Sequence, residues 1–245
     1  MTAPVAVEVR DAATVLLVRD GRKGLEVALL RRRLESVFAR GAYVFPGGAV
    51  DVEDRDLRWA DRSIGHDDAS ASAVLGTPSG GLAFWVAAVR ECFEEAGVLL
   101  ARRPDGRPPA VTDPVGADRF QRHRTAVDDG LVDLFDVCAA EDLHLPVGDL
   151  HYFAHWITPE QAPRRYDTRF FLTRAPDDQA LSHDGSETIA ALWLRPDEAL
   201  DRNAAGDFEL IYPTLRSLEV LTDYPDADAV LSAASAEPLG LEPTP

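Results

Sequence analysis

The 245-residue sequence is poor in cysteine, in positive charge and in long apolar runs. Two cysteines, Cys92 and Cys138, are too few for a disulfide framework, so we expect a reducing compartment. Lys and Arg number 25 against 42 Asp and Glu, which gives a formal charge of −17 and argues against nucleic acid or an anionic membrane as a partner. No stretch approaches the roughly 18 apolar residues that span a bilayer. A cytoplasmic protein is therefore expected.

What is present is the composition of an ordinary globular protein, with 46% hydrophobic and 27% charged residues. The length suits a single domain over residues 1–245. Apolar runs and turn signals predict alternating strands and helices, which favour a mixed sheet with helices on its faces. The predicted strands are 12–18, 25–30, 43–45, 151–157, 168–173 and 188–194; the predicted helices are 82–96, two within 117–143, one from 196 and one from 213 to about 221.

The sequence also predicts a hairpin, a surface excursion and a peripheral tail. Residues 12–30 are expected to form a hairpin with a slightly long loop after Asp20-Gly21. Residues 55–81 are polar and rich in small residues and glycine, so a surface excursion is predicted there. Residues 225–245 are rich in Ala, Pro and Asp and are expected to be a peripheral tail.

The strongest periodic signal lies between Leu82 and Ala96. Its apolar side chains recur at helical spacing and predict one buried stripe. Gly97 follows as a natural left-handed cap, which predicts where the helix ends. The stripe consists of Leu82, Trp85, Val89, Cys92, Phe93 and Ala96.

The same helix carries Glu91, Glu94 and Glu95 roughly opposite that stripe. At spacings of three and four residues these carboxylates repel one another, and two of them lie in the last turn, where the helix dipole disfavours negative charge. A divalent cation with oxygen ligands, such as Mg²⁺ or Mn²⁺, would relieve both conflicts. Arg90, four residues before Glu94, can brace one carboxylate. The alternative is a solvated helix face with no ligand.

The string Arg90-Glu91-Cys92-Phe93-Glu94-Glu95-Ala96-Gly97-Val98, with Phe45-Pro46-Gly47-Gly48 upstream, resembles the Nudix hydrolase signature G-x5-E-x7-R-E-U-x-E-E-x-G-U, where U is a bulky apolar residue. This resemblance implies the Nudix fold, an α/β/α sandwich with a mixed β-sheet. Alignment from Gly48 puts Asp54 at the early glutamate, with Glu53 one residue before it, and leaves open which of the two takes that role. Asp54 and Arg90 are separated by 35 residues where the family has 7, so about 28 residues are inserted.

The insertion, together with Trp156–Pro159 and Tyr166–Leu172, is similar to the branch that contains the coenzyme A and acyl-coenzyme A diphosphatases. The implied substrate is a nucleoside diphosphate linked to another group, most readily coenzyme A or its acyl esters. ADP-ribose, nucleotide sugars and dinucleotides are alternatives. A non-enzymatic ligand-sensing module is also open, but all three helix carboxylates are present and no basic recognition helix is, which favours catalysis.

The resemblance also implies roles for single residues. Glu91, Glu94, Glu95 and a backbone carbonyl near Gly48 would hold Mg²⁺ or Mn²⁺. Arg90, Glu94 and Glu187 are the residues expected to carry catalysis, with Glu94 or Glu187 as general base; the alternative for Glu187 is an ordinary exposed loop residue. Arg32, Arg40 and Gly47 are predicted to contact the substrate, although a solvated strand end would suit the arginines equally. Homodimers are common in the family, so a homodimer is among the expected assemblies.

Overall fold

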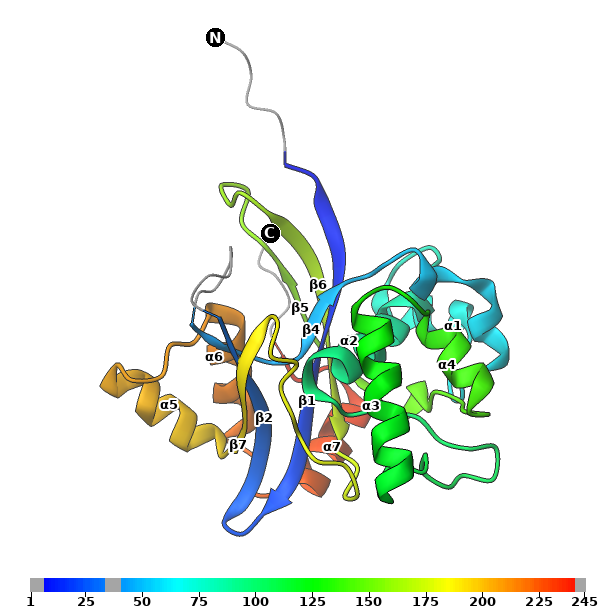
Figure 1. The fold of residues 1–245 in the computed structure, drawn as a ribbon. Coiled ribbons are helices and arrows are strands. Elements are labelled where there is room, and N and C mark those ends of the chain that lie inside the picture. Colours follow the sequence, from blue (N-terminus) through cyan, green and yellow to red (C-terminus); the bar gives the residue numbers. More distant parts are fainter. Residues whose placement is uncertain (1–6, 34–40, 241–245) are drawn as a thin grey trace.

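The computed structural model describes residues 7–33 and 41–240. Seven described strands form one mixed sheet in the order β3-β2-β1-β6-β5, with β4 paired to β1 and β7 paired to β2 (Figure 1). Among the pairs that these described strands form, only β1–β6 is parallel. The strands are β1 Val9–Gly21, β2 Gly24–Arg32, β3 Tyr43–Val44, β4 Gly47–Ala49, β5 His151–Ile157, β6 Arg165–Arg174 and β7 Thr188–Leu194.

The first hairpin is tighter than expected. Gly21 pairs with Gly24, so only Arg22 and Lys23 form the turn, and the predicted long loop is wrong. Gly24, the residue that follows this turn, has φ +115°, a backbone conformation that favours glycine. Beyond the hairpin end β1 pairs with β4, while β2 pairs with β7 and β3. The short strand β4 is absent from the predicted elements.

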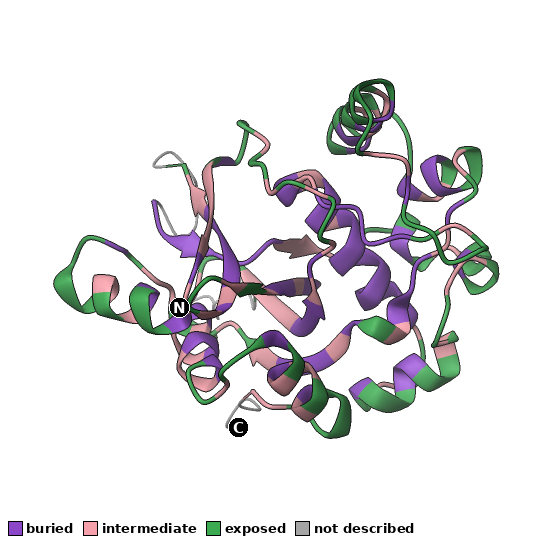
Figure 2. Cartoon of the chain, turned by 90° about the horizontal axis from the view of Figure 1, so that it is seen from below, coloured by how far each residue is buried: buried purple, intermediate pink, exposed green. Residues whose placement is uncertain are grey.

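Helices cover both faces of the sheet, so the predicted α/β/α sandwich is confirmed (Figure 1). One buried cluster lies between the sheet and α2, with α1, α3 and α4 further out, and a second lies under α5, α6 and α7. Figure 2 shows that the sheet and α2 are mostly buried, while the outer helices expose one side. The helices are α1 Asp68–Leu75, α2 Leu82–Ala96, α3 Pro114–Asp128, α4 Leu134–Ala140, α5 Pro196–Ala205, α6 Tyr212–Leu221 and α7 Ala227–Ala236.

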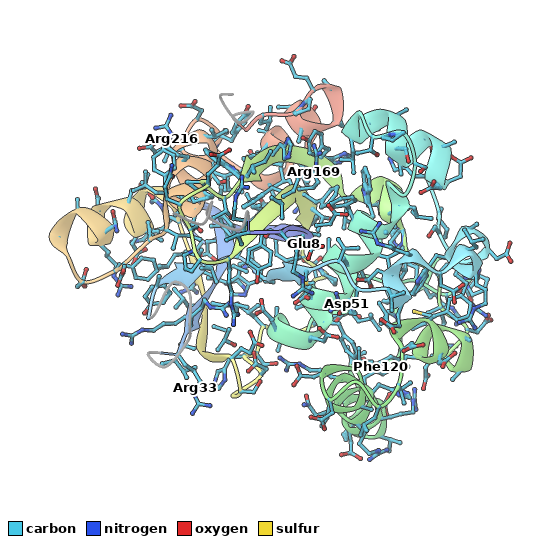
Figure 3. The ribbon with its side chains drawn as sticks, turned by 90° about the horizontal axis from the view of Figure 1, so that it is seen from above. Glu8, Arg33, Asp51, Phe120, Arg169 and Arg216 are labelled. Carbon is cyan, nitrogen blue, oxygen red and sulfur yellow. The ribbon has the colours of Figure 1, made fainter. Side chains whose placement is uncertain are left out.

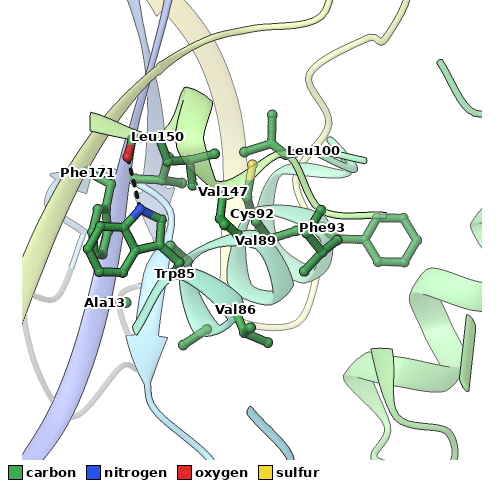
Figure 4. Packing of buried hydrophobic residues seen from close by; sticks show 14 of the residues in the cluster. Ala13, Trp85, Val86, Val89, Cys92, Phe93, Leu100, Val147, Leu150 and Phe171 are labelled. Carbon is green, nitrogen blue, oxygen red and sulfur yellow. Dashed lines mark hydrogen bonds between the residues drawn. The ribbon is translucent and has the colours of Figure 1, made fainter. Parts of the chain in front are cut away.

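Helix α2 has the limits that its sequence predicts. Gly97 ends it in the left-handed conformation with φ +69°, and its amide donates to Phe93 O at 3.1 Å. The whole predicted stripe is buried. Figure 4 shows Trp85, Val89, Cys92 and Phe93 of this stripe, with the Trp85 indole N–H donating to Leu150 O at 2.9 Å. Burial extends beyond the stripe to Ala83, Val86 and Ala87, because neighbouring elements cover α2 on several sides.

The 55–81 insertion is more than a surface excursion, which corrects that expectation. A short 3₁₀ helix, Glu53–Arg55, leads into it, and it contains a second 3₁₀ helix, Leu57–Asp61, followed by α1. Trp59, Ala71 and Leu75 are buried in the same cluster as α2. The segment is polar on average and leaves Leu57 exposed, but Trp59 and Leu75 turn into the core.

The C-terminal segment differs from its prediction in the same way. Helix α7 buries Ala227, Val230 and Ala234 against the sheet, and the Gly240 amide donates to Phe153 O at 2.7 Å. Small alanines permit this close packing, so this part of the predicted peripheral tail belongs to the core. No described helix is long and apolar enough to cross a bilayer.

Candidate active site

The predicted site residues gather where β4 passes the C-terminal half of α2. Pairing of β4 with β1 places Gly47 and Gly48 opposite Thr14 and Ala13. The Gly47 amide donates to Glu95 Oε2 at 2.9 Å. A Cβ atom on Gly48 would lie 2.3 Å from Glu91 Oε1. Each glycine therefore lies directly against one of the helix glutamates, across 43 or more residues of chain.

Arg90 is the residue on which the site's ion pairs converge. Its Nη1 donates to Glu91 Oε1 and to Glu94 Oε2, both at 2.9 Å. Its Nη2 donates to Ala49 O at 2.7 Å and to Asp54 Oδ2 at 2.9 Å. Burial of this side chain opposes its charge, but Glu91 and Asp54 outweigh burial and raise the pKa of Arg90. It is therefore a permanently charged brace that links α2, β4 and the start of the insertion.

The structure also separates the two acidic residues that the sequence leaves as alternatives. Asp54 is 3% exposed and pairs with Arg90, and it accepts a hydrogen bond from the Asp51 amide at 2.8 Å. Glu53 is exposed. Asp54, and not Glu53, thus lies against the arginine of the motif. Asp51, which the sequence analysis missed, lies beside α2 with its carboxylate 3.4 Å from Arg90 Nη2 (Figure 3).

The three helix glutamates are not a solvated face, so that alternative is wrong. Their side chains are only 13%, 12% and 8% exposed for Glu91, Glu94 and Glu95. Burial is the main cause of their raised pKa values: the pKa of Glu94 rises to about 7 and that of Glu95 to about 8. The pKa of Glu91 also rises well above its usual range, because burial and its two acidic neighbours outweigh Arg90. Charged carboxylates at this site therefore lack full compensation from the protein.

Glu187 and Arg32 come together with Glu95, although they are far apart in the sequence. Arg32 Nη2 lies 3.3 Å from Glu187 Oε2, and Arg32 Nη1 lies 3.9 Å from Glu95 Oε1. Glu187 itself is 63% exposed, so its carboxylate faces solvent beside the buried glutamates. The side chain of Asp184 accepts from the Glu187 amide at 2.7 Å and orders this turn. Arg40 lies outside the described residues.

Several groups around the site have no local signal in the sequence. Arg124 on α3 donates to Glu94 O and to Ser182, and Asp128 and Asp184 interact electrostatically with the glutamates. Cys92, on the opposite side of α2, is fully buried, and burial raises the pKa of its thiol. Only the tertiary contacts identify these neighbours.

The donor chemistry of the site fits a divalent cation. Within the described residues, no three His, Cys, Asp or Glu side chains already converge as a closed ligand set. Their oxygens instead face Arg90 and the Gly47 amide. Even so, acidic side chains outnumber the arginines that contact them, and buried oxygen donors of this kind suit hard cations. The acidic side chains are Asp51, Asp54, Glu91, Glu94, Glu95, Asp128, Asp184 and Glu187; the arginines are Arg32, Arg90 and Arg124.

Comparison with known proteins agrees with this geometry. The family model described as the NUDT19 Nudix domain matches residues 64–221, which include all of α2. The chain belongs to the Nudix hydrolases, in the NUDT19 family. Nudix hydrolases act on phosphorus-containing anhydrides and generally use divalent metal ions.

Individual relatives support the same assignment. The chain is 30% identical to chicken (Gallus gallus) acyl-coenzyme A diphosphatase NUDT19, over 85% of this chain and 67% of that protein. It is 29% identical to the human (Homo sapiens) protein of the same name, over 82% and 62% respectively. A Nudix hydrolase structure from Alicyclobacillus acidocaldarius superposes with a TM-score of 0.78 and 30% identity, and covers 97% of this chain and 100% of that one. The chain thus spans about two thirds of the length of its curated Nudix relatives.

Proposed function

We propose that this Nudix hydrolase cleaves the diphosphate linkage of coenzyme A or acyl-coenzyme A, releasing a 3′,5′-ADP half and a phosphopantetheine half. The observation that carries the reaction class is the cluster of buried glutamates that Arg90 holds against Gly47 and Gly48. The substrate class draws on the names of the chicken and human relatives.

The proposed ligands for Mg²⁺ or Mn²⁺ are Glu91, Glu94, Glu95 and the backbone carbonyl of Gly48. A bound divalent cation would neutralise the charge of the diphosphate and polarise it for attack. The raised pKa values of the three glutamates support this assignment, because a cation would stabilise the charged forms that burial disfavours.

The chain's own residues have complementary proposed roles. A water molecule attacks one phosphorus and loses its proton to a carboxylate, while the bridging P–O bond breaks. Glu187 suits the role of base because it is exposed at the edge of the buried cluster and Arg32 orients it. Glu94 is the alternative base, but its carboxylate is already engaged by Arg90. Arg32 and the Gly47–Gly48 backbone are the proposed contacts to the substrate phosphates.

A hydrolysis panel tests this proposal. Coenzyme A, acyl-coenzyme A, ADP-ribose, NADH, nucleotide sugars and nucleoside triphosphates are compared with Mg²⁺, with Mn²⁺ and with EDTA. We expect the highest kcat/KM for the coenzyme A compounds and no turnover in EDTA. A clear preference for another member of the panel would contradict the substrate assignment.

Glu94→Gln tests the site itself. Loss of one carboxylate from the cluster is expected to lower kcat by about 10²–10⁴-fold while the melting temperature stays near that of the wild type. Glu198→Gln, at an exposed position on α5, is the control and should keep full activity. Undiminished turnover in Glu94→Gln would refute the assignment of these glutamates.

A further inference from the structure

Arg124 on α3 is a buried arginine that contacts the site only through backbone and loop groups. The residue is 4% exposed. Its Nε donates to Glu94 O at 2.8 Å, its Nη1 to Ser182 Oγ at 2.9 Å, and its Nη2 to Ser182 O at 3.0 Å. All three nitrogens of the guanidinium are therefore engaged, two of them by one residue of the loop that precedes β7.

The first of these contacts secures the end of α2. Carbonyls in the last turn of a helix lack intrahelical partners, and a positive charge there interacts favourably with the helix dipole. Arg124 supplies both a donor and a charge to Glu94 O, one turn or less before Gly97 ends the helix. Helix α3 runs beside α2, as Figures 1 and 3 show, with Phe120 marking α3 in the latter.

The other contacts dock the loop of residues 179–187 against the same helix end. Gln179 makes a pair of hydrogen bonds to Leu99, accepting from its amide at 2.8 Å and donating to its carbonyl at 2.9 Å. The Ser182 amide donates to Ala96 O at 2.9 Å. Arg124 then closes on Ser182 from the side of α3. The loop is thus held at Leu99, Ala96 and Arg124 before it reaches Glu187.

The turn between Ser182 and Glu187 is also fixed by hydrogen bonds. Asp184 accepts hydrogen bonds from the amides of Glu187 at 2.7 Å and Thr188 at 3.2 Å, which fixes the turn. The other end of the segment enters β7 at Thr188 and is paired with β2 at Arg32. The Arg33 amide also donates to Glu187 O at 3.0 Å. The docking of Ser182 on one side and Arg33 on the other together fix where Glu187 lies.

We propose that Arg124 is a positioning residue, which fixes the Ser182 loop to the end of α2 and so holds Glu187 beside the glutamate cluster. This inference rests on the proposed function, because it gives Glu187 a part in the reaction. Arginine suits the role because its planar fork serves three acceptors at once, which the single ammonium of lysine cannot reproduce. Burial lowers the pKa of Arg124, and the nearby acids Asp184 and Asp128 offset part of that cost.

The test compares Arg124→Gln and Arg124→Lys with a matched control on the same helix. The control is Arg122→Gln, because Arg122 is 66% exposed and pairs only with Asp118 among the described acids. With the best substrate of the panel, Arg124→Gln is expected to lower kcat about 10- to 100-fold with less than a threefold change in KM. Arg124→Lys should recover part of the loss, and Arg122→Gln should match the wild type.

A double variant separates positioning from a general loss of structure. If Arg124 acts through Glu187, adding Arg124→Gln to Glu187→Gln should lower kcat no further than Glu187→Gln alone. Additive losses would overturn the proposal, and so would full turnover in Glu187→Gln.

Amide hydrogen exchange supplies a readout that does not need activity. In Arg124→Gln the amides of residues 182–187 should exchange about tenfold faster than in the wild type, while those of the β1–β6 pair stay protected. Unchanged exchange in the loop would overturn the proposal. If the wild type hydrolyses no member of the panel, the proposed function fails, and the exchange result alone decides whether Arg124 docks the loop.

Discussion

Gly47 and Gly48 are neighbours in β4, yet a methyl group would meet different atoms at each. At Gly48 it would meet the carboxylate of Glu91, the far end of a flexible side chain. At Gly47 it would lie 2.5 Å from Ala13 O and 2.7 Å from Thr14 Cα, both of them backbone atoms in the sheet. The first clash can be relieved by moving a site residue, whereas the second requires the strands to separate.

These contacts predict opposite behaviour for two alanine variants. Gly48→Ala should lower diphosphatase activity at least tenfold with little change in thermal stability, because Glu91 must leave its place. Gly47→Ala should lower the free energy of unfolding by about 1–3 kcal/mol, because overpacking strains the sheet. Urea unfolding and steady-state kinetics on both variants check this. Equal stability losses in the two would show that the contact at Gly48 is structural as well.

At the scale of elements, the insertion is a second support for α2. Trp59 is 2% exposed, its ring lies edge-on to Phe135 of α4 at 5.2 Å, and its indole N–H donates to Glu53 O at 3.2 Å. The first 3₁₀ helix also presents Asp54 to Arg90. Asp54, which directly precedes the inserted residues, thus braces Arg90, while Trp59 within the insertion packs in the same buried cluster as α2.

A pair of substitutions in one 3₁₀ helix measures this support. Trp59→Ala should lower the free energy of unfolding by about 3–5 kcal/mol, as expected for a large buried aromatic. Leu57→Ala is the control, since Leu57 is 89% exposed, and it should change stability by less than about 0.5 kcal/mol. Chemical denaturation of both variants gives the comparison. A small loss of unfolding free energy in Trp59→Ala would mean that the insertion does not support the core.

At the scale of the whole molecule, part of the formal charge of −17 is concentrated in the carboxylates around α2. Buried and half-buried carboxylates around α2 outnumber the arginines that contact them. Repulsion between negative charges is therefore stronger here than the net charge alone implies. A cation that binds only the folded state stabilises it in proportion to the logarithm of its concentration. Screening by salt acts on all exposed charges alike.

This difference predicts a specific response to divalent ions. We expect MgCl₂ to raise the melting temperature of the wild type by several degrees more than KCl of equal ionic strength. In Glu91→Gln that extra increase should be much smaller, because one proposed ligand is lost. Thermal unfolding followed by circular dichroism in both salts checks it. An equal response to MgCl₂ and KCl in the wild type would argue against a cation site in the folded protein.

Local sequence patterns predicted the helices and strands whose first and last residues are set by the segment itself and not by distant contacts. Helix α2 ends at Gly97 because glycine readily takes the left-handed conformation, and the periodicity before it is unbroken. The strands His151–Ile157 and Thr188–Leu194 have the predicted bounds, since each is a short apolar run that contains aromatic and β-branched residues. The insertion and α7 were misread because composition averages over a segment, whereas burial depends on single side chains such as Trp59 and Val230.

The sequence by itself determined helix α2, the spacing of its three glutamates and the family, because these are encoded in consecutive residues. The tertiary structure decided that Asp54 rather than Glu53 pairs with Arg90, that Arg32 reaches Glu187, and that Arg124 holds the loop before β7. Each of these pairs is separated by between 36 and 155 residues of chain. No local pattern specifies such contacts, since they arise only when the sheet and the packed helices bring distant segments together.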